Sequence, residues 1–395
     1  MPSLTLRPNR EKSLLRHHPW IFSGAVDRLD GDPASGATVD LLSASGQFLA
    51  RAAFSPSSQI RARIWTFDPD EQVDMDFFRR RIHSSLVARQ SLHLDGQTNA
   101  FRLINAESDG LPGLIVDRYA EMLVLQSLTA GSEYWKDTLA DLLIEITGLK
   151  DIYERSDADV RELEGLPPKV GCLRGAIPLS PFPILENNLK FNVNLATGHK
   201  TGFYIDQREN RLRVRMLTGG RDVLDCFCYT GGFTVNALAG GAKSVLSVDA
   251  SADALVMCHE NVVLNTFPID RYQSLEGDVF QLLRKFRDEG KSFDMIILDP
   301  PKFAPTAAQA EKAARGYKDI NLLAFKLLRP GGLLVTFSCS GGVDAALFQK
   351  IVASAALDAG VDAQIVEHLT QAPDHPVALN FPEGAYLKGL VCRKA

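Results

Sequence analysis

The feature that most constrains this chain is an alternation of short apolar runs with longer amphipathic segments, from about residue 187 to the C-terminus. The apolar runs have strand length, and the segments between them are long enough for helices. This alternation is typical of a doubly wound α/β domain, in which helices cover both faces of a mostly parallel sheet. The predicted strands are residues 223–225, 244–249, 272–276, 295–299 and 333–338, followed by a terminal hairpin at 362–369 and 386–392.

The first half of the chain follows other patterns. Residues 1 to about 68 alternate with period 2 and are punctuated by Gly and Pro, which predicts a small β-barrel or sandwich. Residues 74–94 carry apolar side chains at helical spacing, and a mixture of strand-like and helix-like segments follows. We therefore predict three domains: a β domain at 1–68, an α+β domain at 74–186 and an α/β domain at 187–395.

The distribution of charge favours a phosphate-bearing partner for the first domain. The net charge of −5 argues against a positive coat over the whole protein. Arg7, Lys12 and Arg16 nevertheless lie in a basic N-terminal stretch, and Arg61 lies in a later stretch without acids. Such clusters are typical of surfaces that meet nucleic acid. Ordinary surface charge is the alternative, and charge alone does not decide between the two.

The sequence contains no pattern typical of a membrane or metal-binding protein. Its longest apolar runs have strand length, and its first residues include no stretch of signal-peptide length. We therefore expect a cytoplasmic protein without membrane contact. The six cysteines form no CxxC pair, and no His cluster has the spacing of zinc ligands, so we expect no metal.

Residues suited to ligand binding follow three consecutive predicted strands. Gly231 and Gly232 follow the first strand and open a helix, where the backbone can approach a ligand. Asp249 ends the second strand, where an acid can accept hydrogen bonds from both ribose hydroxyls. After the third strand, Asp278 can accept from an adenine amino group and Val279 can pack on the ring. Asp225 ends the first strand, so three acids lie at consecutive strand ends, and with the two glycines this set predicts an adenosine site. Asp249 or Asp278 alone could instead cap a helix. The dinucleotide fingerprint GxGxxG is absent, which disfavours a dehydrogenase.

The fourth and fifth predicted strands end in residues suited to substrate binding and nucleophilic chemistry. Asp299 ends the fourth strand, and two prolines stiffen the turn toward Lys302 and Phe303. An acid, a cation and an aromatic face together could hold a planar base. Cys339 follows the fifth strand in a Ser/Gly loop, where a thiolate could meet a substrate, and Lys302 is a candidate source of the positive field that a thiolate needs. Residue type and position alone leave a structural thiol equally open.

These motifs, in this order and spacing, resemble the ribosomal RNA large subunit methyltransferase I family over the whole chain. The segments that carry the resemblance are His18-Pro-Trp-Ile-Phe-Ser-Gly-Ala-Val, Thr201-Gly-Phe-Tyr-Ile-Asp-Gln-Arg, residues 225–233, Asp299-Pro-Pro-Lys-Phe, Arg315-Gly-Tyr-Lys-Asp-Ile-Asn and Phe337-Ser-Cys-Ser-Gly. Members of that family methylate carbon 5 of a specific cytosine in 23S rRNA. The resemblance implies an N-terminal PUA RNA-binding β-barrel, a central α+β domain and a C-terminal class I methyltransferase domain with a seven-stranded, mostly parallel sheet.

The resemblance also implies S-adenosylmethionine as the cofactor and 23S rRNA, or an intermediate of large-subunit assembly, as the substrate. The predicted cofactor contacts are Gln207, Phe227, Tyr229, Gly231, Gly232, Asp249, Ala250, Asp278, Val279 and Asp299. The predicted RNA contacts are Arg7, Lys12, Arg16, Arg61, Lys302 and Phe303. A homodimer is an expected state, although the sequence does not fix the oligomeric state.

Cys339 is implied as the nucleophile and Asp299 as the acid that positions the base. Carbon 5 of cytosine is a poor nucleophile, and addition of a thiolate to carbon 6 makes it electron-rich enough to accept a methyl group. A base then removes the carbon 5 proton and the thiol is expelled. Many RNA cytosine-5 methyltransferases carry a second cysteine just after the fourth-strand proline. Here Pro301 and Lys302 occupy that region, so the base remains unassigned.

Two other functions stay open at this point. Methylation of an exocyclic base amine also suits an acid followed by Pro-Pro and an aromatic, and it needs no thiol. A degenerate scaffold would bind RNA without a cofactor. Residues 315–321 are expected to form a loop that closes on substrate, in preference to a helix start capped by Asp319. For Arg208 and Arg211, an ion pair within the domain is as open as a role in the site.

Overall fold

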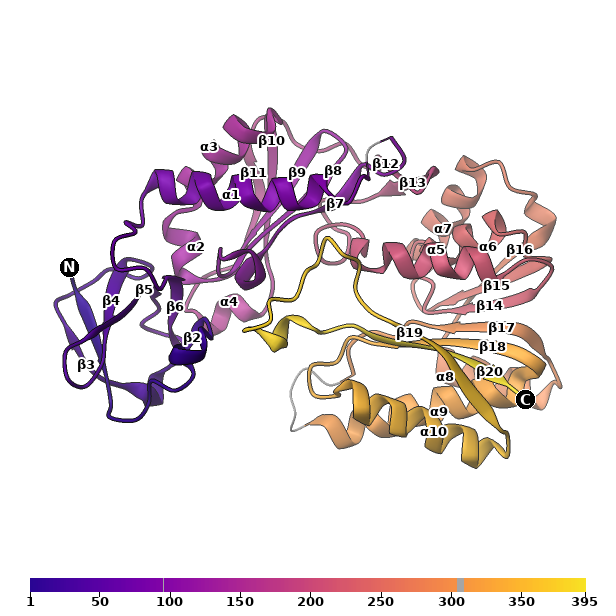
Figure 1. Ribbon diagram of the computed structural model, residues 1–395. Helices are drawn as coiled ribbons and strands as arrows, with labels where there is room; N and C mark the ends of the chain where they lie inside the picture. The colour runs from indigo at the N-terminus through magenta and orange to yellow at the C-terminus, as the bar shows by residue number, and fades with distance from the viewer. Residues whose placement is uncertain (95, 304–308) are drawn as a thin grey trace. The chain divides into compact units, whose positions relative to one another are not determined.

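The computed structural model describes residues 1–94, 96–303 and 309–395, which form two compact units (Figure 1). Unit 1 comprises Met1–Leu185, Val193–Ile205 and Pro373–Gly384. Unit 2 comprises Glu186–Asn192, Asp206–Ala372 and Ala385–Ala395. Among the described residues, no helix combines the length and the hydrophobicity needed to span a lipid bilayer.

An N-terminal sheet begins unit 1 and is the β domain predicted from the sequence. Its strands lie in the order β2-β6-β5-β4-β1-β3. Neighbours pair antiparallel except β1 and β4, which are parallel. The period-2 pattern turns Leu4, Val39 and Ile64 inward, where they are buried. The strands are β1 (Ser3–Leu6), β2 (Trp20–Phe22), β3 (Val26–Asp30), β4 (Thr38–Leu42), β5 (Phe48–Phe54) and β6 (Ile60–Thr66).

A second sheet of unit 1, in the order β11-β10-β9-β8-β7, is accompanied by helices. Helix α1 is the helix predicted at 74–94, and Asp74 caps it by accepting from Phe77 N at 2.9 Å. The single helix predicted at about 132–147 is instead two helices that meet at Trp135, whose ring packs on Phe78 with centroids 4.9 Å apart. The strands β10 and β11 were not predicted. The elements are α1 (Met75–Gln90), β7 (Ala100–Asn105), β8 (Leu114–Tyr119), β9 (Met122–Ser127), α2 (Ala130–Tyr134), α3 (Lys136–Thr147), β10 (Asp151–Ser156), α4 (Val160–Leu163) and β11 (Lys169–Arg174).

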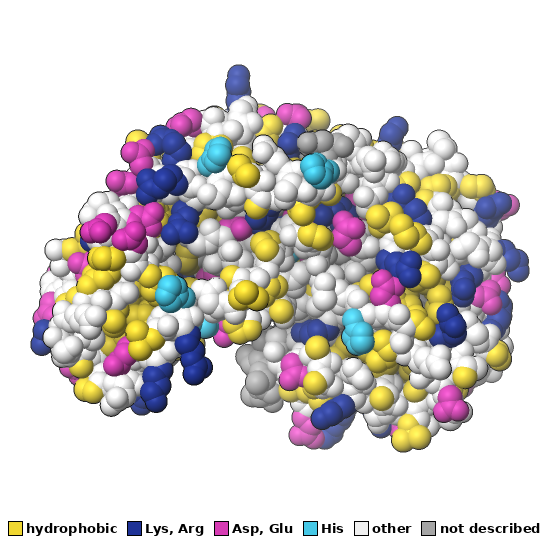
Figure 2. Space-filling view, in the orientation of Figure 1, with side chains coloured by type: hydrophobic (Ala, Val, Ile, Leu, Met, Phe, Trp, Pro, Cys, Tyr) yellow, Lys and Arg dark blue, Asp and Glu magenta, His cyan; other side chains and the backbone are white. Residues whose placement is uncertain are grey.

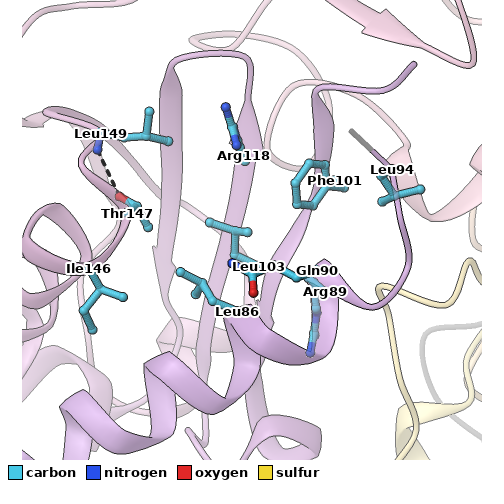
Figure 3. A pocket seen from close by; sticks show the side chains of 10 residues that line it. All are labelled: Leu86, Arg89, Gln90, Leu94, Phe101, Leu103, Arg118, Ile146, Thr147 and Leu149. Atoms are coloured by element: carbon cyan, nitrogen blue, oxygen red, sulfur yellow. Dashed lines mark hydrogen bonds between the residues drawn. The ribbon is translucent and has the colours of Figure 1, made fainter. Parts of the chain in front are cut away.

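A cavity of about 200 Å³ lies in unit 1 between α1, the strands β7 and β8, and the end of α3 (Figure 3). Mostly apolar side chains line it, with polar groups from Gln90, Arg89 and Arg118. Arg89 is held by Asp109 through hydrogen bonds of 2.8 and 2.6 Å. None of the described residues that line this cavity belongs to the predicted site, so it plays no part in the chemistry discussed below.

The sheet of unit 2 is the α/β sheet predicted from the sequence. In the described part of the chain it has seven strands in the order β16-β15-β14-β17-β18-β20-β19. The first five are parallel, and β20 lies antiparallel between β18 and β19. Each predicted strand overlaps an observed one. The strands are β14 (Asp222–Cys226), β15 (Ser244–Asp249), β16 (Tyr272–Glu276), β17 (Phe293–Leu298), β18 (Leu328–Ser338), β19 (Ala363–Leu369) and β20 (Lys388–Lys394).

Six helices of ordinary length accompany this sheet among the described residues (Figure 1). They are α5 (Arg208–Leu217), α6 (Gly232–Ala239), α7 (Ala252–Leu264), α8 (Val279–Asp288), α9 (Ala310–Leu327) and α10 (Ala345–Ala359). The prediction of a loop at 315–321 is wrong, because these residues lie inside α9. Tyr317 and Ile320 are fully buried at helical spacing, and Asp319 pairs with Arg284 at 2.5 Å instead of capping a helix.

Two late segments of the chain belong to unit 1. The chain passes from unit 1 to unit 2 within the hairpin of β12 (Phe182–Glu186) and β13 (Leu189–Val193), and Val193–Ile205 then belongs to unit 1 again. There Thr201 donates to Asp117 at 2.7 Å. Pro373–Gly384 also belongs to unit 1, and Asp374 accepts from Arg102 N at 2.8 Å. The three continuous domains predicted from the sequence therefore stay a prediction, since these segments interrupt the range 187–395.

Candidate active site

The carboxyl ends of the five parallel strands of the unit 2 sheet carry most of the residues predicted for cofactor binding and chemistry. Cys226 on β14 pairs with Val248 on β15 and with Leu298 on β17, and Leu298 pairs with Thr336 on β18. The residues that follow each of these strands therefore come to one edge of the sheet. This register aligns the cofactor loop after β14 with the segment after β17 that begins at Asp299.

The loop between β14 and α6 has an unusual backbone. Phe227 and Tyr229 have φ values of 61° and 49°, and Gly231 has a φ of 82°. Left-handed φ values are costly for residues other than glycine and cluster at functional sites, where the surrounding structure maintains them. A Cβ on Gly231 would lie 2.5 Å from the Cys258 Sγ, so this position requires glycine for both backbone and space. The loop is thus a shaped backbone in front of the N-terminus of α6, which begins at Gly232.

Asp249 organises the same loop from the end of β15. Its carboxylate accepts from Tyr229 N at 2.8 Å and from Ser251 N at 2.9 Å. Ser251, and not Asp249, is the N-cap of α7. The alternative that Asp249 is a helix cap is therefore wrong. Its half-exposed carboxylate keeps acceptor capacity beyond these two bonds.

Asp278, in contrast, is a helix cap. Its carboxylate accepts from Gln281 N at 2.9 Å at the start of α8. The side chain is exposed, so the remaining oxygen is accessible. Val279 beside it is only 3 % exposed and belongs to the apolar core of unit 2. The predicted contacts of both residues with an adenine remain predictions.

Asp225, near the end of β14, is a strongly perturbed acid at this edge. It is fully buried, and one carboxylate oxygen accepts from the Thr234 hydroxyl at 2.7 Å. The other oxygen, Oδ1, accepts no hydrogen bond from any described residue. The pKa of Asp225 is raised to about 7, mainly by burial and also by the neighbouring carboxylates of Asp299 and Asp249, and the hydrogen bond from Thr234 partly opposes this rise. A buried acid without an ionic partner would be stabilised by a cationic ligand group.

The remaining predicted cofactor residues occupy different environments. Gln207 is buried at the N-cap of α5, and its carboxamide oxygen accepts from Asn210 at 2.6 Å. Ala250 is exposed directly after Asp249. Phe227 is half-buried against the core. Gln207 is thus fixed by the protein itself, whereas Ala250 is open to a ligand.

The segment after β17 is tied to the segment after β18. Phe303 N donates to the Ser340 hydroxyl at 3.1 Å, and the Tyr317 hydroxyl lies 2.9 Å from the same oxygen. The Phe303 ring packs on Tyr317 with centroids 4.7 Å apart. Phe303 and Asp299 are half-exposed, and Lys302 is exposed. These contacts fix the Asp299–Phe303 turn beside the loop that carries Cys339.

Cys339 differs from most of the other cysteines. It is half-exposed directly after β18, whereas Cys226, Cys228, Cys258 and Cys392 are buried. Burial raises the pKa of Cys226 well above its usual value, so that thiol is held in its neutral form. Of the buried and half-exposed thiols, Cys339 is therefore the one placed to meet a substrate at the sheet edge.

Sequence reasoning missed the residue that lies over the Cys339 loop. Lys388 on β20 pairs with Ser338 and donates to the Ser340 carbonyl at 2.9 Å. It interacts electrostatically with Cys339. No pattern in the sequence pointed to Lys388, because β20 is distant from Cys339 in the sequence and comes beside it only through pairing with β18.

The predicted RNA contacts of the first domain lie in unit 1. Arg7, Lys12 and Arg16 are exposed, and Arg61 is half-buried with its guanidinium donating to the Pro56 carbonyl. The neighbouring Arg51 and Arg63 are buried in ion pairs with carboxylates, so they are structural. Figure 2 shows Lys and Arg side chains projecting from the N-terminal sheet. No group of His, Cys, Asp and Glu among the described residues could hold a metal ion.

Comparison with known families identifies the fold and the activity class. Residues 167–393 match the model of S-adenosylmethionine-dependent methyltransferases, and residues 4–67 match the model of a PUA-like domain. A protein of Shewanella amazonensis, named ribosomal RNA large subunit methyltransferase I, is 53% identical over 99% of this chain and 98% of its own length. The chain belongs to the ribosomal RNA large subunit methyltransferase I family. A member from Aeromonas salmonicida is likewise 53% identical over 97% of both chains.

Solved structures agree with this assignment at the level of the fold. An S-adenosylmethionine-dependent methyltransferase from Streptococcus mutans covers 100% of both chains with 22% identity and a TM-score of 0.85. A methyltransferase complexed with SAH covers 100% of both chains with 22% identity and a TM-score of 0.87. The methyltransferase fold and the PUA-like domain implied by the resemblance are confirmed.

The cofactor of this ribosomal RNA large subunit methyltransferase I family member is S-adenosylmethionine. The residues of the sheet edge fit that molecule. The unpartnered Oδ1 of Asp225 suits the ammonium group of its methionine part, and the free acceptor capacity of Asp249 suits its ribose hydroxyls. The left-handed loop at 227–231 places the backbone of Gly231 directly before the N-terminus of α6, where a ligand could approach it.

Proposed function

We propose that this protein transfers a methyl group from S-adenosylmethionine to carbon 5 of a cytosine in 23S rRNA, through a covalent bond between Cys339 and carbon 6. Methylation of ribosomal RNA follows from the names of relatives 53% identical over nearly the whole chain. The single observation that carries the finer proposal is the setting of Cys339: a half-exposed thiol directly after β18, beside the strand that leads to Asp299.

The side chains at this edge would supply a nucleophile, a hydrogen-bonding acid and a stacking face for carbon 5 methylation. Cys339 would attack carbon 6 of the ring, and the displaced electron pair would raise the reactivity of carbon 5. Asp299 would hydrogen-bond the polar edge of the base and stabilise charge that develops there. Phe303, fixed by Tyr317 and Ser340, would offer a stacking face.

When bound, S-adenosylmethionine supplies an activated methyl group next to this edge. The chain's part is to hold it through the residues predicted for cofactor binding. Asp225 would accept a hydrogen bond from its ammonium group, and Asp249 would accept from its ribose hydroxyls. Proximity of donor and acceptor lowers the barrier, because the reaction becomes unimolecular within the complex.

The N-terminal PUA-like domain would bring the RNA to the enzyme. Arg7, Lys12 and Arg16 are exposed and would contact phosphates, whose neutralisation provides affinity without sequence preference. Naked 23S rRNA and a large-subunit assembly intermediate are the two substrates to compare. A cytoplasmic location and a homodimeric state are parts of this proposal that remain to be tested.

A second activity, methylation of an exocyclic base amine, is kept because no second cysteine follows the fourth-strand proline. The turn Asp299-Pro-Pro-Lys-Phe is compatible with either chemistry. An amine methyltransferase needs no thiol. Removal of Cys339 therefore separates the two activities.

The test uses the full chain with 23S rRNA and with large-subunit particles from cells that lack the gene. The variants are Cys339→Ala and, as a matched control, Cys172→Ala, which removes an exposed thiol of unit 1. Nucleoside mass spectrometry would identify the product. We expect 5-methylcytosine with the wild type and Cys172→Ala, and a loss of at least about 10³-fold with Cys339→Ala.

Three outcomes would overturn the proposal. Full methylation by Cys339→Ala, or a product methylated on an exocyclic nitrogen, would favour the amine activity. RNA containing 5-fluorocytosine adds a direct test. A base cannot remove fluorine from carbon 5 as it removes a proton, so the Cys339 adduct should persist. Absence of a covalent complex with wild-type protein would contradict the adduct.

A further inference from the structure

We propose that Lys388 is a positioning residue for Cys339, whose ammonium group favours the thiolate form of that side chain and holds the loop that carries it. The inference rests on the proposed function, since it concerns how the proposed nucleophile is made reactive. It goes beyond that function by assigning a role to β20, the antiparallel strand next to β18.

Sheet pairing brings Lys388 to the Cys339 loop. β18 and β20 are antiparallel, and Ser338 lies opposite Lys388 in their register. The Lys388 Nζ then reaches past this pair and donates to the carbonyl oxygen of Ser340 at 2.9 Å. Cys339 is the residue between these two contacts. These two contacts hold the ammonium group beside the backbone on either side of Cys339.

The surroundings of Lys388 make its charge effective. The side chain is partly withdrawn from solvent, and burial lowers the pKa of Lys388 while Cys339 and Asp344 raise it. A charge shielded from water acts on a neighbour with less screening than an exposed one. A thiolate at Cys339 and an ammonium at Lys388 consequently stabilise each other's charged forms.

Three other groups face this pair. Asp344, at the N-cap of α10, attracts the Lys388 ammonium and competes with the thiolate for it. Lys302 lies near enough to lower the pKa of Lys388, but it is exposed and its own field is screened. Tyr317 interacts electrostatically with Cys339, and its pKa is raised by burial, so it stays neutral. Lys388 is thus the cation best placed to act on the sulfur.

In the proposed reaction the Lys388 ammonium stabilises the Cys339 thiolate twice, before it attacks carbon 6 and when it leaves. The thiolate electron pair forms the sulfur–carbon 6 bond, and the carbon 5–carbon 6 π pair attacks the methyl group, whose bond to the sulfonium breaks. A base then takes the carbon 5 proton, the carbon 5–hydrogen pair restores the double bond, and the sulfur–carbon 6 bond breaks. The sulfur leaves as a thiolate, which Lys388 again stabilises. Lys388 itself exchanges no proton in this sequence.

The experiment measures the thiolate directly and uses no RNA. Full-length protein is alkylated with iodoacetamide from pH 5.5 to 9.5, and the modified Cys339 peptide is quantified by mass spectrometry. Only the thiolate reacts, so the midpoint of the rate against pH reports its formation. We expect Lys388→Gln to move this midpoint up by about one pH unit and to slow alkylation at pH 7 about tenfold.

The choice of variants separates charge from hydrogen bonding. Lys388→Gln keeps an N–H donor for the Ser340 carbonyl but has no charge, and Lys388→Arg keeps the charge and should stay within a few-fold of wild type. Lys302→Gln is the matched control and should move the midpoint far less. If Lys388→Gln fails to fold, the wild-type protein still tests the inference: Cys339 should be alkylated with a lower midpoint than the exposed Cys172, and an equal or higher midpoint would overturn it.

An unchanged midpoint in folded Lys388→Gln, or an equal shift in Lys302→Gln, would overturn this inference. That failure is distinguishable from failure of the proposed function. If Cys339→Ala still methylates RNA while Lys388→Gln shifts the midpoint, the proposed function is wrong and the pairing of Lys388 with Cys339 stands. If Cys339→Ala is inactive and the midpoint does not move, the function stands and Lys388 is structural.

Discussion

Replacement of Asp225 by asparagine is predicted to stabilise unit 2 in the absence of cofactor, with a gain that grows as pH rises. The carboxyl group is fully buried and its pKa is raised to about 7, mainly by burial. In the unfolded chain it ionises near 3.8. Folding at neutral pH must therefore bury a charge or protonate the group, and asparagine does neither.

The size of the effect follows from the two pKa values. The folded protein binds a proton that the unfolded chain has released between about pH 4 and pH 7, so the wild type loses stability over this window as pH rises. About three units at roughly 1.4 kcal/mol each give a cost of the order of 4 kcal/mol above pH 7. Between pH 5 and pH 8 the difference between variant and wild type should widen by about 2–3 kcal/mol.

Urea unfolding of both proteins at pH 5 and pH 8, without cofactor, tests this. Groups common to both proteins cancel in the difference. Asp222→Asn on the same strand is the matched control: a hydrogen bond from Arg329 lowers the pKa of Asp222, so its stabilising contribution is complete above the ordinary carboxyl range. That variant should be less stable than wild type by an amount that does not change between pH 5 and pH 8.

Asp225→Asn, although more stable than the wild type without cofactor, should bind the cofactor more weakly. If Asp225 accepts from the cofactor ammonium, calorimetry should show about 10- to 100-fold weaker S-adenosylmethionine binding by Asp225→Asn, from the loss of a charged hydrogen bond. A stability difference independent of pH, or a variant that is less stable at pH 8 than at pH 5 relative to wild type, would refute the assignment of a raised pKa to a buried, unpartnered acid.

Two further substitutions test the packing that supports the site. Gly231→Ala should lower the free energy of unfolding by more than the roughly 1–2 kcal/mol that a left-handed alanine costs, because its Cβ would lie 2.5 Å from Cys258 Sγ. Gly241→Ala is the control, since Gly241 has the same φ of 82° in open space. Equal losses from the two variants would show that the contact with Cys258 is unimportant. Glu186→Gln removes the charge that faces buried Arg211 at 2.5 Å and should cost about 3–5 kcal/mol in chemical denaturation. Glu367→Gln, in the half-exposed pair with Arg213, should cost under about 1 kcal/mol. A similar loss from both variants would contradict the role of burial.

Much of the architecture was predictable because the signals are local. A period of two or of 3.6 residues is written in consecutive positions, so the strands around 244–249 and 272–276 and the helix at 74–94 follow from the sequence alone. The chemistry-bearing residues were predictable for a related reason. In a parallel sheet the carboxyl ends of the strands share one edge, so Asp249, Asp299 and Cys339 could be grouped before their contacts were known.

The local sequence pattern gave a wrong prediction of secondary structure where burial of side chains decides it. Residues 315–321 combine glycine with charged and aromatic side chains and suggested a loop. The structure buries Tyr317 against Phe303 and Phe348 and continues the helix through them. Packing of Tyr317 against its neighbours outweighed the weak helical preference of glycine. A single sequence does not reveal this packing.

The sequence by itself determined the strands of the unit 2 sheet, the acids and the cysteine at their ends, and through them the family. Only the tertiary structure decided that Asp225 is buried with an unpartnered oxygen, that Lys388 lies over the Cys339 loop, and that Val193–Ile205 and Pro373–Gly384 belong to unit 1. The physical reason is that burial and cross-strand register depend on which distant segments pack together. Periodicity specifies which face of a segment is apolar, but not the partner that covers it.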